Sequence, residues 1–357
     1  MDLLNLSQKA RISRFTGNVI AVVRIALGGE RVLMDDVSIP VGKVPPILLQ
    51  PLLKELRGFH RDEVLIGPQI GEDAAVIGWP AGAFLLATSD PIVGAVKGTG
   101  NLLVNVNAND IADKGGDPAY MIVVIILPNT MALDDVASLM KEIDEEAKKL
   151  GVAIIGGHTE FSDRYNYPIV VGTMLGIGHK VLRASSIRPG DLILLTKHVG
   201  LEGMVILAHD REDLLASVLS SEEIAEVKSW DSMLSILPEA RLLRDLASFM
   251  HDPTEGGVVG GIAEIVSLTS LKVRLDFDTF PIHSITEKVS EALAFDPLHL
   301  ISSGVLLAVL PPEKIDVAKN RLREQGIAYS IVGKFDDTGM GASDLMTKEE
   351  LWQLLSR

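Results

Sequence analysis

The sequence predicts a two-domain protein of the α+β or α/β class. Strand-like apolar runs alternate with amphipathic helix patterns in both halves, as in folds that pack helices on mixed sheets. The 357 residues exceed what one hydrophobic core usually serves. A Pro-Gly-Asp turn in IRPGDLILLT starts a new strand near residue 185. We therefore expect an N-terminal domain over 42–184, a C-terminal domain over 185–340 and a tail helix over 341–357.

The first 41 residues differ in charge from the rest of the chain. Residues 1–34 carry a segment charge of +3, whereas the remaining residues carry −18. This contrast, with Met34 just before the first recognisable pattern, predicts an N-terminal appendage over 1–41 or a start codon assigned too far upstream. A genuine edge strand is the alternative. The apolar run at 18–27 is too short to span a bilayer and contains Arg24.

In the first half, each element is predicted from its residue pattern. PPILLQPLLKELRG (45–58) is typical of a short amphipathic helix closed by glycine, and two β-rich segments joined by a WPAG turn follow. VNVNANDIADKGG predicts a helix ended by Gly115 and Gly116, and YMIVVIILP predicts a buried strand. LDDVASLMKEIDEEAKKLG is an amphipathic helix that Asp134 or Asp135 can cap. VAIIGGHTE and YPIVVGTMLGIG predict two further strands.

In the second half, helices are expected from 200 to 246, with an interruption at Pro238. MHDPTEGGVVGGIAEIVSL predicts a glycine-rich loop that enters a helix. LISSGVLLAVL and IAYSIVGKF predict strands on either side of a last long helix.

Composition excludes several classes of function. The formal charge of −15 argues against nucleic acid or an anionic membrane as the main partner. The absence of cysteine excludes disulfides, thiolate metal sites and cysteine nucleophiles. Without a secretory signal pattern, we expect a cytoplasmic protein.

The segment VNVNANDIAD places several asparagines and aspartates in a predicted helix, where such residues are usually unfavourable. Helical spacing puts Asn107, Asp110 and Lys114 on one face, while Val104, Ala108 and Ile111 face a core. A solvated face is the alternative, but such faces usually carry Glu and Lys. We therefore interpret the polar face as part of a site.

Acidic residues recur at strand ends and small-residue turns of the first domain: Glu72, Asp73, Asp90, Asp110 and Glu160. Carboxylates that converge repel one another unless a cation neutralises them. Several hard oxygen ligands suit magnesium bridging to phosphates. Each residue alone is more typical of a cap or turn, so the inference depends on the set.

The common nucleotide and hydrolase motifs are missing. The sequence has no GxxxxGK[ST], GxGxxG, HExxH or GxSxG motif. In the second domain, HDPTEGG at 251–257 offers backbone amides at a helix N-terminus, which favour an anion. Tight packing of a glycine loop is the alternative interpretation. GLEG at 200–203 is a similar and weaker candidate.

Taken together, these motifs resemble the aminoimidazole ribonucleotide (AIR) synthase superfamily, in its HypE-like hydrogenase-maturation branch. The resemblance rests on IGEDAAVI, TSDPIVG, NANDIADKGGDPAYM, IIGGHTE, IRPGDLILLT, MHDPTEGG and DPLHLISSGVLLAV, in the family's order over roughly residues 42–335. It implies an ATP- and Mg²⁺-dependent enzyme with a dimer-forming N-terminal sheet flanked by helices and an α/β C-terminal domain. It also implies a homodimer whose sheets form a shared barrel.

The resemblance also implies site residues. Asp73, Asp90 and Asp110 match the family's magnesium-binding aspartates. The predicted catalytic residues are Asp90, His158 and Glu160. The predicted cofactor-binding residues are Asn107, Asn109, Lys114, Gly156, Gly157, Thr159, Asp252, Thr254, Gly256 and Gly257, of which the last three match a loop that faces substrate.

This chain departs from the branch at three places. HypE acts on a cysteine at its own C-terminus, whereas this sequence ends MTKEELWQLLSR and has no cysteine, so we expect no self-modification. His158 stands where HypE has an aspartate, and Pro91 follows the metal-site aspartate. We expect phosphorylation or activation of an oxygen of a small substrate. A nucleotide-binding maturation or regulatory protein without turnover, acting with a protein partner in metallocentre assembly, is the alternative.

Overall fold

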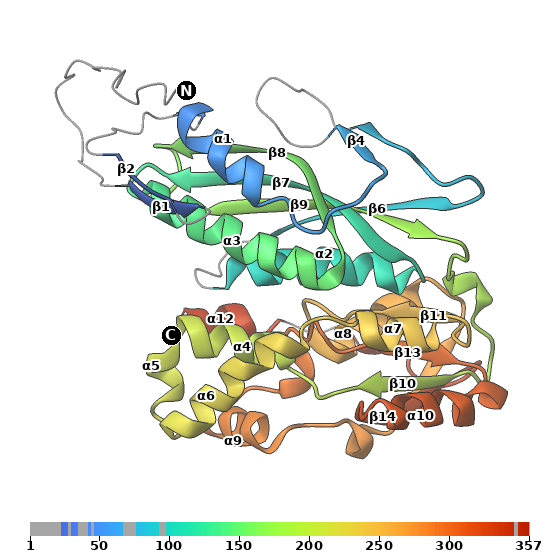
Figure 1. Cartoon of the computed structure of the whole chain (residues 1–357). Coiled ribbons are helices and arrows are strands. Elements are labelled where there is room, and N and C mark those ends of the chain that lie inside the picture. Colours follow the sequence, from blue (N-terminus) through green and yellow to red (C-terminus); the bar gives the residue numbers. More distant parts are fainter. Residues whose placement is uncertain are drawn as a thin grey trace.

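The computed structural model describes residues 23–27, 30–34, 42–43, 46–66, 76–92, 98–345 and 349–356. They form two stacked layers, each built on a five-stranded sheet, with the N-terminal half above the C-terminal half in Figure 1. The two-domain mixed α/β class is thus confirmed. Asp73 and residues 1–22 lie outside the described residues, so the N-terminal appendage stays a prediction. Among the described residues, no helix combines the length and apolar character that crossing a bilayer requires.

The N-terminal sheet has the strand order β3-β8-β7-β9-β6. Its strands are β3 (Gly42–Lys43), β6 (Phe84–Ile92), β7 (Asp117–Pro128), β8 (Ala153–Ser162) and β9 (Ile169–Gly178). β7 and β8 are parallel, while the other pairs are antiparallel. Two small sheets pair β1 (Val23–Leu27) with β2 (Glu30–Met34) and β4 (Val64–Ile66) with β5 (Val76–Ile77). The helices are α1 (Pro46–Glu55), α2 (Thr99–Asp113) and α3 (Leu133–Leu150).

The C-terminal sheet is antiparallel, with the order β11-β13-β10-β14-β12. Its strands are β10 (Leu192–Thr196), β11 (Phe249–His251), β12 (Lys272–Leu275), β13 (Leu307–Leu310) and β14 (Tyr329–Asp336). The helices are α4 (Leu201–Asp210), α5 (Glu212–Leu215), α6 (Ser221–Ser229), α7 (Leu237–Leu243), α8 (Gly257–Ser267), α9 (Ser284–Leu293), α10 (Ile315–Glu324), α11 (Ala342–Leu345) and α12 (Leu351–Leu355).

Helix α3 forms where the apolar period predicts it. Val136, Ile143 and Ala147 are buried, and Gly151 ends the helix in a left-handed conformation with φ 77°. The start differs in detail from the prediction, because Ala132 occupies the N-cap position. The carboxylate of Asp135 accepts the Ala132 N–H at 2.7 Å from inside the first turn.

Helix α2 is buried on two sides. Val104, Ala108 and Ile111 lie in the core, as predicted, but Asn107 and Asn109 are also fully buried. Figure 1 shows the reason, since α2 lies between its own sheet and the C-terminal layer. Of the predicted polar face, Asn107 is buried, Asp110 is half-buried and Lys114 is exposed, so the alternative of a solvated face holds only at the end of the helix.

Two other expectations need correction. Pro238 lies in the first turn of α7, where a missing N–H costs nothing, so it begins a helix instead of interrupting one. The C-terminal tail does not form one helix over 341–357, because the described residues there hold two short helices, α11 and α12.

Candidate functional site

The site begins with two carboxyl groups that α2 and β6 bring together. Thr88 and Asp90 lie on β6, and Asp110 lies in the last turn of α2. The Thr88 hydroxyl is 2.6 Å from Asp110 Oδ2 and 3.3 Å from Asp90 Oδ2. One proton serves both contacts, so the hydroxyl donates mainly to Asp110. The structure thus brings together Asp90 and Asp110 of the predicted metal set.

The pKa of Asp110 is raised to about 7, and burial is the largest cause. A hydrogen bond with Asp90 and the negative charges of Asp90 and Asp113 contribute to this rise, while the Thr88 hydroxyl opposes it. Two carboxylates this close do not both ionise readily at neutral pH. A divalent cation would replace the retained proton and neutralise the pair.

Asn107 fixes the position of Asp90 from the helix. Its Oδ1 accepts the Asp90 N–H at 3.1 Å, and its Nδ2 donates to Asp90 O at 3.3 Å and to Leu103 O at 2.9 Å. The side chain is completely buried. Asn107 therefore holds the strand on the helix, and its predicted contact with a cofactor stays a prediction that these bonds do not support.

Two glycines of β9 let α2 approach the sheet. A Cβ at Gly172 would lie 2.7 Å from Asn107 Nδ2 and 2.5 Å from Met121 Cε, and one at Gly176 would lie 2.1 Å from Ile111 Cγ2. Any side chain there would push the helix from the sheet. Neither Gly172 nor Thr88 was predicted from the sequence. Glycines four residues apart inside the strand pattern VVGTMLGIG were the available signal for Gly172.

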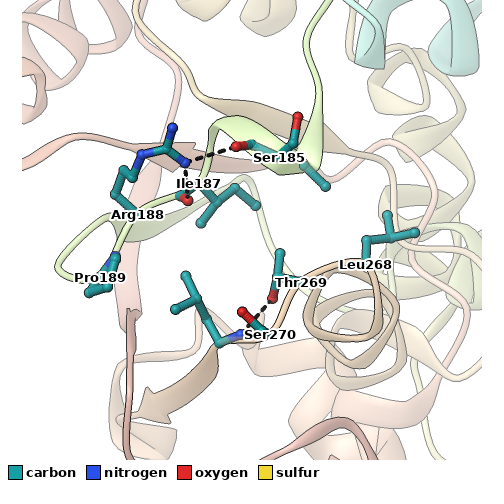
Figure 2. Close-up of a pocket in the computed structure, with 9 residues that line it drawn as sticks. Ser185, Ile187, Arg188, Pro189, Leu268, Thr269 and Ser270 are labelled. Carbon is teal, nitrogen blue, oxygen red and sulfur yellow. Dashed lines mark hydrogen bonds between the residues drawn. The ribbon is translucent and has the colours of Figure 1, made fainter.

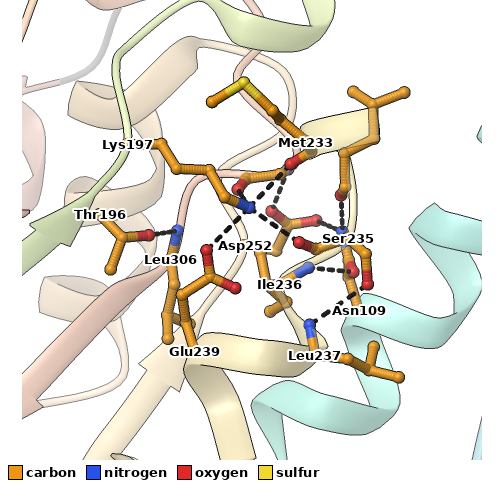
Figure 3. A network of polar contacts seen from close by, with 12 residues as sticks. Asn109, Thr196, Lys197, Met233, Ser235, Ile236, Leu237, Glu239, Asp252 and Leu306 are labelled. Carbon is orange, nitrogen blue, oxygen red and sulfur yellow. Dashed lines mark hydrogen bonds and ion pairs between the residues drawn. The ribbon is translucent and has the colours of Figure 1, made fainter. Parts of the chain in front are cut away.

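Asn109 and Asp252 connect the two halves of the molecule (Figure 3). Asn109 Nδ2 donates to Leu234 O at 2.9 Å and to Asp252 Oδ2 at 2.8 Å, and Asn109 Oδ1 accepts the Ile236 N–H at 3.0 Å. The other Asp252 oxygen accepts the Gly304 N–H at 2.8 Å. Because these groups are engaged inside the protein, direct nucleotide binding by Asn109 and Asp252 stays a prediction that requires this network to open.

Asp113 adds a second buried carboxyl to this junction. Its Oδ2 accepts the Asp252 N–H at 2.7 Å. Burial raises the pKa of Asp113 to about 6, although the nearby His251 opposes the rise. The pKa of Asp252 is also raised, by burial first and then by the charge of Asp113. Lys114 does not join the acidic pair, since its Nζ lies over the Phe249 ring at 4.8 Å.

His158 and Glu160 lie on the opposite face of the sheet from Asp90. His158 is paired with Val124 across the β7–β8 ladder, and Glu160 with Ile126. Ser89 of β6 lies on this same face. Because successive side chains of a strand alternate between faces, the next residue, Asp90, points to the other face, toward α2. The His158 Nε2 and Glu160 Oε2 atoms are 3.1 Å apart, and both side chains are about one-third exposed. A single chain therefore does not gather the three predicted catalytic residues.

The glycine turn beside His158 has three distinct environments. A Cβ on Gly157 would lie 2.0 Å from Val123 O, so only glycine fits there. Gly156 faces open space, since no described atom lies within 4 Å of the position that a Cβ would take. Thr159 is buried on the helix-covered face. Nucleotide binding by these residues stays a prediction.

The glycine loop of the second domain already holds a carboxylate. Gly256 N–H donates to Glu349 Oε2, and Ile301 N–H donates to Glu349 Oε1 at 3.2 Å. The expected preference for an anion at the N-terminus of α8 is thus met by a residue of the tail. Binding of substrate by Thr254, Gly256 and Gly257 stays a prediction.

A separate open hollow of about 390 Å³ lies between the 184–189 segment and the end of α8 (Figure 2). Its one charged residue is Arg188, whose Nη1 donates to Ser185 O at 2.8 Å and to Ile187 O at 3.0 Å. Because the local backbone engages this guanidinium, the hollow is a weaker site than the acidic pair. Within the described ranges, no group of three or more His, Asp or Glu side chains could hold a metal ion.

Comparison with known proteins follows this two-layer division. Residues 71–178 match the N-terminal domain, and residues 188–345 the C-terminal domain, of the AIR synthase related protein family. Carbamoyl dehydratase HypE of Cupriavidus necator is 28% identical over 262 residues, which cover 71% of this chain and 73% of the relative.

Solved structures show the same fold. Hydrogenase maturation protein HypE in complex with ATP matches with a TM-score of 0.65 at 23% sequence identity. The matched region covers 75% of this chain and 81% of the HypE chain. A chain of the HypE–HypF complex matches with a TM-score of 0.61 at 20% sequence identity, and the matched region covers 75% of this chain and 88% of that one. Thiamine-monophosphate kinase from Stenotrophomonas maltophilia K279a matches with a TM-score of 0.65 at 20% sequence identity, and the matched region covers 79% of this chain and 91% of the kinase chain.

Proposed function

Because the chain belongs to the family of AIR synthase related proteins, we propose that it is an ATP- and magnesium-dependent enzyme that phosphorylates or activates an oxygen of a small substrate. The observation that carries this proposal is the pair Asp90–Asp110, two carboxyls held together by one hydroxyl in a mostly buried position. A protein rarely retains such a repulsive pair unless it has a use for it.

The residues at the pair fit magnesium. Their donor atoms are hard carboxylate oxygens, and the pKa of Asp110 is raised first by burial and then by the nearby carboxylates, both of which a bound cation would offset. Asp90 and Asp110 would hold the ion, together with Asp73, which lies outside the described residues. When bound, magnesium would neutralise charge on the phosphates during transfer. Thr88 orients Asp110, and Asn107 fixes the backbone of Asp90.

Two comparisons support nucleotide use. One structural neighbour is a hydrogenase maturation protein HypE in complex with ATP, and another is a kinase by name. The relative from Cupriavidus is named a carbamoyl dehydratase. These 357 residues contain no cysteine, so the acceptor in this proposal is an oxygen of a separate small molecule.

We further propose that two copies pair through the face of the N-terminal sheet opposite α2, which β4 and β5 cover only in part. Ile122, Val124, Ile126 and Val171 alternate with buried residues and remain only partly covered in one chain. Phe84, at the start of β6, is 53% exposed. A homodimer of this kind would bring His158 and Glu160 to the interface, where their catalytic role would depend on the second copy. Light scattering would test it, and a monomer at micromolar concentration would contradict it.

The alternative is a maturation or regulatory protein that binds nucleotide without turnover. The HypE–HypF complex favours it, because a structural neighbour of this chain assembles with another protein. Tight ATP binding without hydrolysis, with a co-purified partner, would select this alternative over the enzyme.

Calorimetric titration of ATP, with and without magnesium, tests the proposal. We expect magnesium-dependent binding that Asp110→Asn weakens by about tenfold or more, because one charged ligand is lost. Asp134→Asn is the matched control, since Asp134 is an exposed aspartate of α3. Equal affinity in Asp110→Asn and wild type would reject the site, and no binding to wild type would reject the function.

A further inference from the structure

A second acidic site lies where both layers meet the C-terminal helix. A cavity of about 80 Å³ is bounded by Ile92 of β6, Leu102 of α2, and Glu202 and Ile206 of α4. The rest of the lining comes from Pro91, Glu255, Ile301, Leu351, Trp352 and Leu355. Figure 1 shows α12, which carries three of these residues, at the side of the lower layer that faces the upper one. A water needs about 10–15 Å³ by this measure, so the cavity holds roughly five waters or a ligand of similar size.

The charged residues that line this cavity are both acidic. Glu202 is only 4% exposed, and its Oε2 has no hydrogen-bond partner among the described residues. Glu255 lies beside it on the α8 loop, and the carboxyl of Glu349 is close enough to raise the pKa of Glu202. Native proteins rarely leave a buried carboxyl oxygen unpaired, so Glu202 points to a missing hydrogen-bond donor.

The backbone donors nearby are already engaged. Glu349 accepts the N–H groups of Gly256 and Ile301, and Ser302 Oγ accepts the Gly200 N–H at 2.8 Å at the start of α4. The Ser303 hydroxyl near Glu202 has no partner among the described residues, so an anionic ligand would meet carboxylates and little more than this one free donor. The weaker candidate motif GLEG thus supplies an acid, Glu202, instead of an anion site.

The ionisation of Glu202 is consistent with this arrangement. The pKa of Glu202 is raised to about 7, first by burial and then by the charges of Glu255 and Glu349, while the neighbouring polar groups of Ser303 oppose the rise. A bound cation would offset the cost of burying the Glu202 charge and its repulsion by Glu255 and Glu349, because it supplies the opposite charge beside the carboxylate.

We propose that this cavity binds a small organic cation, an alkylammonium or alkylguanidinium group whose charge lies on Glu202 and Glu255. The short apolar part of the ligand packs on Ile206 and Ile301, and the Trp352 ring supplies a surface suited to a cation. The cavity reaches Pro91, the residue that follows Asp90, so such a ligand lies beside the end of the strand that carries the acidic pair. The identification of this ligand as the small substrate rests on the proposed function. The existence of the cation site does not depend on the proposed function.

The experiment uses three probes of similar size on the full chain without nucleotide. Methylguanidinium is the cation, methylurea is its neutral counterpart, and propionate is an anion. Binding is measured by calorimetry at pH 8 for wild type, Glu202→Gln and Glu255→Gln. Glu313→Gln, an exposed acid of the segment before α10, is the control. Magnesium-ATP binding is titrated separately on the same samples.

We expect methylguanidinium to bind wild type and the Glu313→Gln control, and to bind Glu202→Gln about tenfold or more weakly, with a smaller loss in Glu255→Gln. Methylurea and propionate should bind far more weakly. Equal binding of methylguanidinium to all four proteins, or preferred binding of methylurea, would overturn the proposal. If Glu202→Gln does not fold, the comparison of Glu255→Gln with wild type tests the proposal, because Glu255 is exposed and its substitution should not disturb folding.

The two proposals fail separately. Magnesium-ATP binding without methylguanidinium binding overturns the cation site and leaves the proposed function standing. Methylguanidinium binding without magnesium-ATP binding keeps the cation site and removes the nucleotide-dependent function.

Discussion

Two buried polar clusters near the domain junction differ in how their charges are balanced. At one, Lys197 Nζ lies 2.9 Å from Glu239 Oε1 and donates to the carbonyls of Met233, Ser235 and Gly304 (Figure 3). At the other, Asp90 and Asp110 lie side by side and share one hydroxyl donor, that of Thr88.

The difference separates structural charge from functional charge. The Lys197 cluster supplies its own counter-ion and holds the 233–239 segment to β10 and the 304 turn. Lys197 also has a positive φ of 56°, a conformation that surrounding contacts must hold in place. The aspartate pair lacks a counter-ion among the described residues and is therefore suited to an external one. Substitutions at buried charges of each kind can break or sharpen this contrast.

The largest effect is expected where a compensated charge loses its partner. Lys197→Met leaves Glu239, only 1% exposed, without a counter-ion and should lower the free energy of unfolding by roughly 3–5 kcal/mol. Urea denaturation measures it. Lys141→Met, which removes an exposed i,i+4 partner of Glu145, should change stability by less than about 1 kcal/mol. Similar losses in both variants would contradict the structural role of the Lys197 cluster.

The second prediction concerns an uncompensated acid, Glu202. Its pKa in the folded protein, about 7, lies above the unfolded value, so the folded state binds its proton more tightly. The contribution of Glu202 to stability is fully present below pH 4.5 and is lost as pH rises from there through about 7. In Glu202→Gln the fall in the free energy of unfolding over this pH range should be smaller than in wild type by roughly 2–3 kcal/mol.

Unfolding free energies at pH 5 and pH 8 measure that difference. Glu255 and Glu349 face Glu202 and contribute to its raised pKa, so Glu255→Gln should produce a smaller change in the same direction. An identical pH profile for Glu202→Gln and wild type would show that Glu202 ionises normally.

The third prediction addresses the packing that forms the aspartate pair. Gly172→Ala places a Cβ against Asn107 and Met121, and it should cost roughly 1–3 kcal/mol of stability and weaken magnesium-nucleotide binding. Gly156→Ala, with nothing described near its Cβ, should leave stability within about 0.5 kcal/mol. Thermal unfolding compares them, and equal melting temperatures would show that α2 does not need this close approach.

The smallest effect is expected at the hydroxyl between the two carboxyls. Thr88→Val keeps the side-chain shape but removes the donor to Asp110, which should raise the pKa of Asp110 and weaken magnesium-nucleotide affinity by about 3- to 10-fold. Calorimetric titration of magnesium-ATP at pH 6.5 and pH 8.5 tests this prediction, and we expect the larger loss of affinity at the lower pH. An unchanged affinity at both values would remove Thr88 from the site.

Much of the fold could be predicted from the sequence because most elements show a clear period or a glycine terminus. The helix over 133–150, the strands over 117–128 and 153–162, and the mixed α/β class follow from apolar spacing alone. Family membership was predicted from motif order and is confirmed.

The site was less predictable, because side-chain contacts depend on which face each residue takes. The motifs grouped Asp90 with His158 and Glu160, whereas strand pairing places them on opposite faces of one sheet. They also assigned Asn107 and Asn109 to a ligand, although the amides of these residues bond to the backbone and to the second domain. The contact of Glu349 with Gly256 could not be found from sequence, since the two are far apart in the chain.

The bond between Asn107 and the backbone of Asp90 also bears on aggregation. Strand β6 is at the end of its sheet, and an edge strand presents unpaired N–H and C=O groups that another chain can extend. At Asp90 the asparagine amide already satisfies both groups. The same contact that positions the acidic pair therefore also blocks that end of the strand from pairing with the backbone of another chain.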